Sequence, residues 1–77
     1  MQLVYLEWID SSSTRGWWDA EKDETALVYS VGWLVNKTKR TITISTSRSE
    51  TNKFADQMNI PLAAIRKYRV IKEYPNL

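Results

Sequence analysis

The 77-residue chain contains no cysteine and no histidine. Without these residues it can form no disulfide, and it lacks the usual ligands of a structural zinc site. The commonest general base near neutral pH and the thiol nucleophile are also missing, and the serines at positions 11–13 have no histidine to activate them. We therefore predict a protein that is not an enzyme and that holds no metal or cofactor.

Long apolar segments are missing as well. No apolar run approaches the roughly 18 residues of a membrane span. The first ten residues, MQLVYLEWID, lack the basic-then-apolar order of a signal peptide. We expect no membrane insertion and a place in the cytoplasm.

The length allows one domain, residues 1–77, with a small core. A chain of this size buries only about 60% of the surface that its unfolded form exposes, and such domains commonly gain stability from disulfides, a metal or oligomerisation. The first two routes are closed here, so we expect a homo-oligomer.

The charges are unevenly distributed along the chain. The net charge is +2, but residues 1–30 carry six acids and two bases, whereas residues 31–77 carry nine bases and three acids. This asymmetry indicates either a basic binding face or complementary surfaces that meet in an oligomer. The acids at positions 19–24 lack the glycine and the ligand spacing of a calcium loop, so we expect them to lie on a solvated surface.

Residues 27–47 predict a β-hairpin around which the rest of the chain is arranged. Apolar residues alternate at positions 27, 29, 31, 33 and 35 of one arm, and Ile42 and Ile44 alternate with hydroxyl residues on the other. Gly32 interrupts the first arm and indicates a bulge, a bend or a close backbone approach. We expect the polar face of the second arm, with Thr43 and Ser45, to contact water or a ligand.

The remaining segments complete a small all-β fold. Strands are predicted at residues 3–10, 58–60 and 67–73, with a short helical turn beginning at Pro61. Residues 11–26 and 47–57 are expected to be loops, although a helix over residues 49–58 is the competing prediction. The pattern predicts a five-stranded SH3-like or Sm-like barrel with one short helical turn before the last strand, or else a five-stranded open sandwich.

Two adjacent tryptophans, Trp17 and Trp18, follow Gly16 in the first expected loop. A tryptophan at this place would either cover the open end of a barrel or provide a stacking platform for a base or an anchor in a protein interface. Adjacent side chains of an extended chain point in opposite directions, so the two roles are compatible.

Arg66 precedes the last predicted strand and Arg69 lies within it. A guanidinium fork held on a rigid strand suits a phosphate group, so we predict that both arginines bind ligand together with the two tryptophans. The alternative for Arg69 is a salt bridge to Glu7 or Asp10.

A second group of bases, Lys37, Lys39 and Arg40, lies at the tip of the predicted hairpin. Charged residues at this position commonly protect a sheet edge from pairing. They are also candidates for contact with a phosphate or a partner protein.

Four segments of the chain resemble small uncharacterised proteins encoded by tailed bacteriophages and prophages. These segments are EWIDS at residues 7–11, GW at 16–17, SVGWLV at 30–35 and IPLAAI at 60–65, with Arg69 soon after. The resemblance spans nearly the whole chain and implies a phage or prophage origin and a role in the bacterial cytoplasm, but no activity. The segment at residues 60–65 and the following strand also resemble the end of Sm-type barrels, which form rings.

Together these features predict a non-catalytic, homo-oligomeric phage accessory protein. It would bind and sequester a phosphate-bearing host ligand, such as a nucleotide or cyclic nucleotide used in bacterial immune signalling. One alternative is a protein-interaction module that inhibits a host enzyme through Trp17 or Trp18. A second is a single-stranded nucleic-acid binder, which we expect to be weak because the N-terminal acids partly cancel the field of the C-terminal bases.

Overall fold

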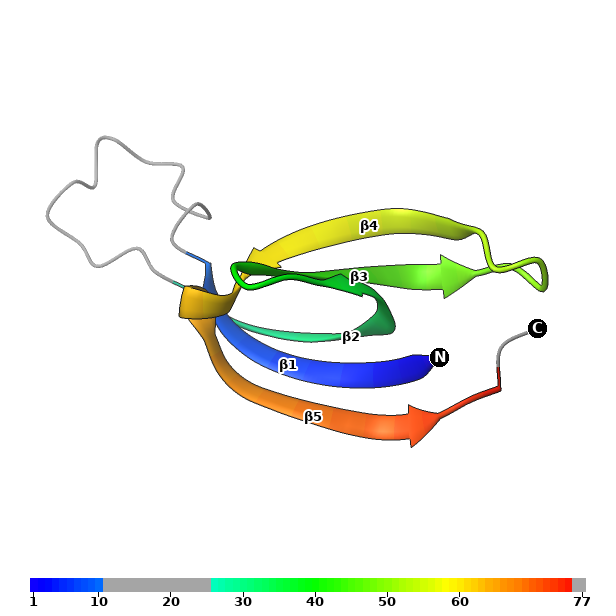
Figure 1. The fold of residues 1–77 in the computed structure, drawn as a ribbon. Coiled ribbons are helices and arrows are strands. Elements are labelled where there is room, and N and C mark those ends of the chain that lie inside the picture. Colours follow the sequence, from blue (N-terminus) through cyan, green and yellow to red (C-terminus); the bar gives the residue numbers. More distant parts are fainter. Residues whose placement is uncertain (11–25, 76–77) are drawn as a thin grey trace, which may run out of the picture.

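The computed structural model describes residues 1–10 and 26–75, which form one sheet of five antiparallel strands (Figure 1). The strands are β1 (Gln2–Asp10), β2 (Ala26–Lys37), β3 (Thr41–Arg48), β4 (Phe54–Pro61) and β5 (Ile65–Glu73), and the 3-10 turn η3 (Leu62–Ala64) precedes β5. Their order across the sheet is β4-β3-β2-β1-β5. The predicted all-β class, the central hairpin and the short helical turn before the last strand are confirmed.

Strand β2 belongs to two layers because it bends sharply. Residues 26–33 pair with β1 and residues 33–37 pair with β3. In Figure 1 the sheet consequently folds over, with β3 and β4 above and β1 and β5 below. No pairing joins β4 to β5 among the described residues, so the sheet is open and resembles a barrel only loosely.

The bend requires Gly32. A Cβ atom added there would lie 2.8 Å from the carbonyl oxygen of Ser45 and 3.1 Å from the Cβ of Ile44. The predicted close backbone approach is therefore present, whereas the irregular register of β2 falls farther along, between Leu34 and Asn36.

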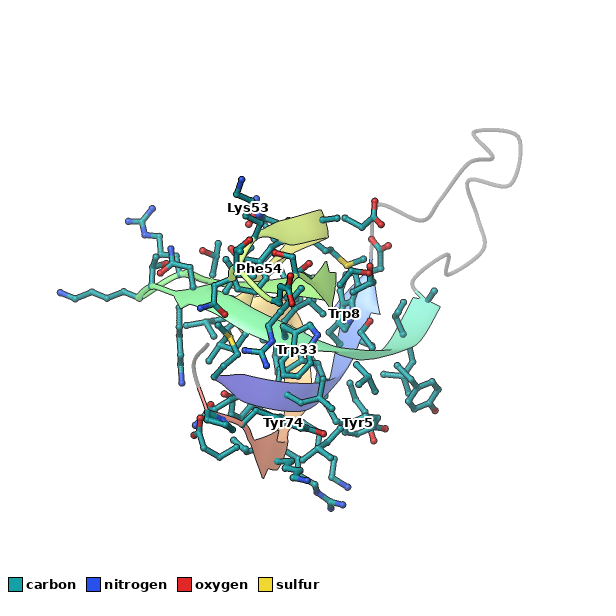
Figure 2. All side chains as sticks on the ribbon, turned by 90° about the vertical axis from the view of Figure 1, so that its right-hand side faces the viewer. Tyr5, Trp8, Trp33, Lys53, Phe54 and Tyr74 are labelled. Carbon is teal, nitrogen blue, oxygen red and sulfur yellow. The ribbon has the colours of Figure 1, made fainter. Side chains whose placement is uncertain are left out.

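The core lies between the two layers. Its buried side chains are Val4, Leu6 and Trp8 from β1, Ile42 and Ile44 from β3, and Ile60 from β4. The indole Nε1 of Trp8 donates a hydrogen bond to the hydroxyl oxygen of Ser30 at 3.0 Å, so the buried ring keeps a polar partner. Figure 2 shows Trp8 between the layers and Tyr5 on the outside of the same strand.

The segment between β3 and β4 differs from both predictions for it. The competing helix over residues 49–58 is wrong, and the expected loop over residues 47–57 is present only at residues 49–53, because β3 continues to Arg48 and β4 begins at Phe54. Ser49 anchors a tight turn instead of capping a helix, since its hydroxyl oxygen accepts the backbone N–H of Lys53 at 3.0 Å. Asn52 adopts a φ of 60°, a left-handed conformation that asparagine tolerates in turns.

The polar face of β3 is also more enclosed than expected. Thr43 and Ser45 are buried, so the prediction that they meet water or a ligand is wrong. Pairing with β4 provides their hydrogen-bond partners: Thr43 donates to Asn59 Oδ1 at 2.5 Å, and Ser45 donates to the carbonyl oxygen of Ala55. Burial is tolerated because these hydroxyls remain satisfied.

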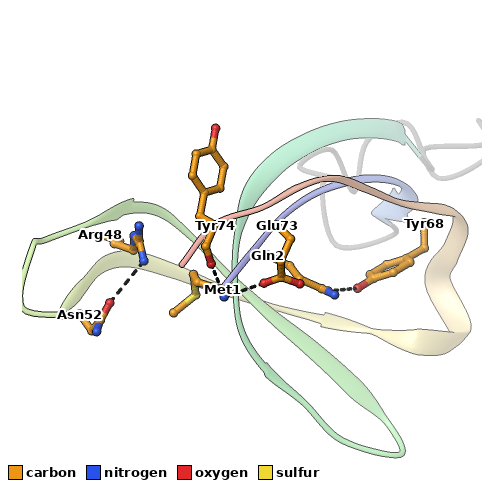
Figure 3. A network of polar contacts seen from close by, with 7 residues as sticks. All are labelled: Met1, Gln2, Arg48, Asn52, Tyr68, Glu73 and Tyr74. Carbon is orange, nitrogen blue, oxygen red and sulfur yellow. Dashed lines mark hydrogen bonds and ion pairs between the residues drawn. The ribbon is translucent and has the colours of Figure 1, made fainter. Parts of the chain in front are cut away.

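The N-terminus is held against the end of β5 (Figure 3). The Met1 ammonium group donates to Glu73 Oε2 at 2.7 Å and to the carbonyl oxygen of Tyr74 at 2.8 Å. The Tyr74 N–H in turn donates to the Met1 carbonyl oxygen at 2.8 Å. These contacts extend the pairing of β1 with β5 by one residue on each side. Within the described ranges, the structure has no helix of the length and apolarity needed to cross a membrane.

Candidate functional site

One surface of the sheet, here called the outer face, is formed by the side of β1 turned away from the core and by the neighbouring residues of β2 and β5. Its members are Leu27, Tyr29 and Val31 of β2, Leu3, Tyr5, Glu7 and Ile9 of β1, and Lys67 and Arg69 of β5. The three β2 residues are 47%, 64% and 51% exposed. The outer face is therefore apolar along β2 and basic along β5.

Glu7, the single acid among these residues, accepts a hydrogen bond from a residue of its own strand. The Tyr5 hydroxyl donates a hydrogen bond of 2.6 Å to Glu7 Oε2. This hydrogen bond, aided by partial burial and the negative charge of Glu7, raises the pKa of Tyr5 to about 12. Tyr5 therefore stays protonated at neutral pH and holds the carboxylate of Glu7 along β1.

Two bases of β5, Lys67 and Arg69, lie beside this carboxylate and this tyrosine on the same face. Lys67 lies opposite Glu7 and Arg69 lies opposite Tyr5 in the register of β1 with β5. Although a salt bridge of Arg69 to Glu7 or Asp10 was the alternative prediction, the described residues contain no ion pair of Arg69 or Lys67. Two exposed cations on one strand, neither of them in an ion pair within the described residues, form a candidate anion-binding site.

Arg66 does not join Arg69, although the sequence groups them. Its Nη1 donates to the carbonyl oxygen of Ala63 at 3.0 Å, which holds the guanidinium against η3. The carbonyl oxygen of Arg40 accepts the Leu62 N–H at 2.8 Å, so the tip of the β2–β3 hairpin meets the same turn.

The hairpin-tip bases consequently lie near Arg66. The Nζ of Lys37 lies 5.0 Å from the ring centroid of Tyr68, within the range of a cation–π interaction. Lys39 and Arg40 are exposed in the turn that follows. The predicted basic residues thus form two groups, with Lys37, Lys39, Arg40 and Arg66 around η3 and Arg69 on the outer face.

Trp17 and Trp18 lie outside the described residues, so their predicted roles stay predictions. Sequence analysis did not single out Trp33. Its ring packs edge-on against Tyr74 at 5.0 Å between centroids, and the guanidinium of Arg48 lies 4.5 Å from its centroid. Trp33 therefore links β2, the end of β3 and the residue after β5.

The outer-face aromatics Tyr5 and Tyr29 were also missed as candidate site residues. The signal that could have identified them is the apolar character of both faces of residues 3–10, because a strand covered on one side only normally alternates with polar residues.

The described residues contain no group of three or more aspartate, glutamate, histidine or cysteine side chains arranged to hold a metal ion. Among their titratable side chains the resolved pKa shifts are those of Tyr5, raised, and Glu73, lowered chiefly by the hydrogen bond from the N-terminal ammonium group. Neither shift moves a group into the range of a general acid or base at neutral pH.

Comparisons with known proteins do not assign the chain to a family. No protein-family model matches it, and neither the curated proteins nor the solved structures contain a significant match. Its function must therefore be argued from the fold and from the residues of the outer face.

Proposed function

We propose that this protein is a non-catalytic binding protein that captures a phosphate-bearing ligand, a nucleotide or cyclic nucleotide, on its outer face. The observation that carries the proposal is the pair of exposed bases, Lys67 and Arg69, beside a glutamate that Tyr5 already engages. A phosphate group would form the ion pairs that these bases lack among the described residues, and the planar fork of Arg69 can bind two of its oxygens.

The other half of such a ligand has a matching surface. Tyr29, Glu7 and Lys67 occupy one row across β2, β1 and β5, and Tyr29 is 64% exposed. Because neighbouring strands lie about 4.8 Å apart, this row extends over roughly 10 Å from the aromatic ring to the base. Stacking of a nucleobase on Tyr29 would leave its phosphate within reach of Lys67 and Arg69.

Capture alone would be the function. The sequence has no cysteine or histidine to support conversion of the ligand, and sequestration requires only affinity and abundance. The resemblance to phage and prophage proteins supports a setting in the host bacterial cytoplasm, where removal of a signalling nucleotide would counter immunity. In this proposal the protein acts as a homo-oligomer.

Thermal unfolding with a panel of signalling nucleotides tests the proposal. A ligand present at about 100 times its Kd stabilises the folded state by about 2.7 kcal/mol. For a domain of this size, each kcal/mol raises Tm by about 4–8 °C, so a true ligand should raise Tm by roughly 10–20 °C.

A matched pair of variants connects the shift to the site. Arg69→Ala should abolish most of the nucleotide-induced increase in Tm. Lys53→Ala removes an equally exposed cation from the turn before β4 and should retain the increase. Absence of a shift with every nucleotide tested, or equal loss of the shift in both variants, would contradict the proposal.

The exposed apolar strip of Leu27, Tyr29 and Val31 supports a second candidate, an interaction module that inhibits a host enzyme. Contiguous exposed apolar side chains mark protein interfaces, where aromatic anchors dominate the binding energy. A pull-down from bacterial lysate should then recover one stoichiometric protein that is lost with Tyr29→Ala, and with Trp17→Ala or Trp18→Ala if these residues are the anchors. Recovery of no partner by the wild-type protein would exclude this candidate.

A further inference from the structure

The first half of β2, residues 26–31, has an edge that is not protected. It pairs with β1 on one side, and no described strand pairs with it on the other. Its sequence, ALVYSV, contains no charged residue and no proline. Natural proteins usually protect a strand edge with such residues, because an unprotected edge is a template for the addition of another strand.

A groove follows this edge, between β2 and β4. It consists of two adjoining hollows of about 600 and 240 Å³, and Met58 of β4 lines both. Val28 and Asp10 line the larger hollow, and Tyr29 and Asp56 line the smaller. Both charged residues that line the groove are acids, so it favours an extended segment that combines apolar and basic side chains.

The other edge of the same layer, β5, combines apolar and basic side chains; its charges deter pairing with a like-charged edge, but they complement the acids that line the β2 groove. Strand β5 pairs with β1 on one side only among the described residues. Residues 66–72, RKYRVIK, carry four bases and no acid. Val70 and Ile71 are 41% and 50% exposed.

We propose that the β5 edge of one copy of this protein pairs with the β2 edge of a second copy, in residues 26–31, and forms a head-to-tail assembly with a continuous sheet. The occupant of the β2 groove is thus another copy of the chain. The inference goes beyond nucleotide capture and does not depend on it.

The charges favour the pairing of a β5 edge with a β2 edge over the pairing of two β5 edges. Two β5 edges would bring eight bases together, whereas the β2 edge is uncharged and lies beside the groove that Asp10 of β1 and Asp56 of β4 line. Like charges across a pair of strands destabilise it, so the β5 edge pairs better with the uncharged β2 edge beside these acids than with a second β5 edge. Strand β4 is a poorer partner because Asp56 has a φ of 57° and Pro61 ends the strand, so the regular row of donors is interrupted.

The assembly would also change the outer face. In one copy, β1 separates the aromatic strip of β2 from the bases of β5. In the assembly, Tyr29 of one copy would lie on the strand directly beside Lys67 and Arg69 of the next. A heterologous interface of this kind closes into a ring or continues as a filament, depending on the rotation between copies.

Light scattering coupled to size exclusion, over a range of concentrations, provides the test. Val31→Lys places a base on the exposed side of the β2 edge, and Arg69→Glu places an acid on the β5 edge. Each variant alone should shift toward the monomer, with the dissociation constant raised roughly tenfold or more. Lys67→Glu repeats the β5 change in case Arg69→Glu does not fold, and Lys53→Glu, in the turn before β4, should leave the assembly intact.

Mixing the variants distinguishes the pairing modes. An equimolar mixture of Val31→Lys and Arg69→Glu should associate, because the first protein still offers a native β5 edge and the second a native β2 edge. A monomeric wild-type protein at all concentrations would overturn the proposal. Association of the β5 variants at the wild-type level would overturn it as well, in favour of pairing between two β2 edges, and so would a mixture that stays monomeric although both variants fold.

Discussion

Replacement of Gly32 by alanine is the sharpest single test of how the sheet bends. The added Cβ would lie 2.8 Å from the backbone oxygen of Ser45, 3.1 Å from Ile44 Cβ and 3.2 Å from Ile44 Cδ1. The shortest of these contacts involves backbone in the pairing of β2 with β3, so it cannot be relieved by rotation of a side chain. The sheet itself must shift.

We expect Gly32→Ala to lower the free energy of unfolding by about 2–3 kcal/mol, in the upper part of the range for overpacking of a core. This is a large share of the total stability of a domain of this size, which is about 4–12 kcal/mol. At about 4–8 °C per kcal/mol, Tm should fall by roughly 10–20 °C.

Urea and thermal unfolding followed by circular dichroism measure this loss. Val31→Ala, at the neighbouring exposed position, is the matched control and should change stability by about 1 kcal/mol or less. The double variant Gly32→Ala/Ile44→Val removes the Cδ1 contact only and should recover less than half of the loss. The reasoning is refuted if Gly32→Ala is no worse than Val31→Ala, or if Ile44→Val restores full stability.

Three further predictions concern pH and nucleic acid. The pKa of Tyr5 in the folded state is about 12, against an ordinary value of 10.0. Its hydrogen bond to Glu7 therefore stabilises the fold below pH 10, and this contribution is lost as the pH rises through 12. Tyr5→Phe should remove this alkaline dependence of Tm. The pKa of Glu73 is lowered from 4.5, chiefly by the hydrogen bond from the Met1 ammonium group. The contribution of this contact to stability is therefore complete above pH 4.5 and is lost as the pH falls through the lowered pKa. Glu73→Gln should reduce the dependence of Tm on pH in this acid range, and an unchanged slope would contradict the assignment. Fluorescence polarisation should detect only weak binding of single-stranded DNA or RNA, with a Kd on the order of 10⁻⁴ to 10⁻⁶ M at physiological salt. Tighter binding that persists at higher salt and disappears with Arg69→Ala would instead make nucleic acid the ligand.

Much of the fold could be predicted because it depends on patterns formed by neighbouring residues in the sequence. The alternation in residues 27–47 identified the central hairpin, and Pro61 marked the turn before β5. Val4, Leu6 and Trp8 share one face of the predicted first strand, and all three are buried. These features depend on the period of side chains along a strand and on the fixed φ of proline, which are properties of neighbouring residues.

The first part of β4 could not be predicted in the same way. In residues 54–59, FADQMN, three of the six are polar and five of the six are exposed, so the segment lacks the apolar alternation of a half-buried strand. They become a strand because β3 offers them a row of hydrogen-bond partners. Their conformation is therefore decided by pairing rather than by their own preference.

The candidate site was likewise determined partly by the sequence and partly by the tertiary structure. The sequence by itself determined the absence of thiol and imidazole chemistry and the excess of bases in residues 31–77, and it marked Gly32 as the place of a bulge, a bend or a close backbone approach. Only the tertiary structure decided that Arg66 turns to η3 whereas Arg69 stays on the outer face, and that Tyr5 engages Glu7. Register between strands fixes these relations, and it arises from contacts between residues far apart in the chain, such as Tyr5 with Arg69 and Glu7 with Lys67, which no local pattern records.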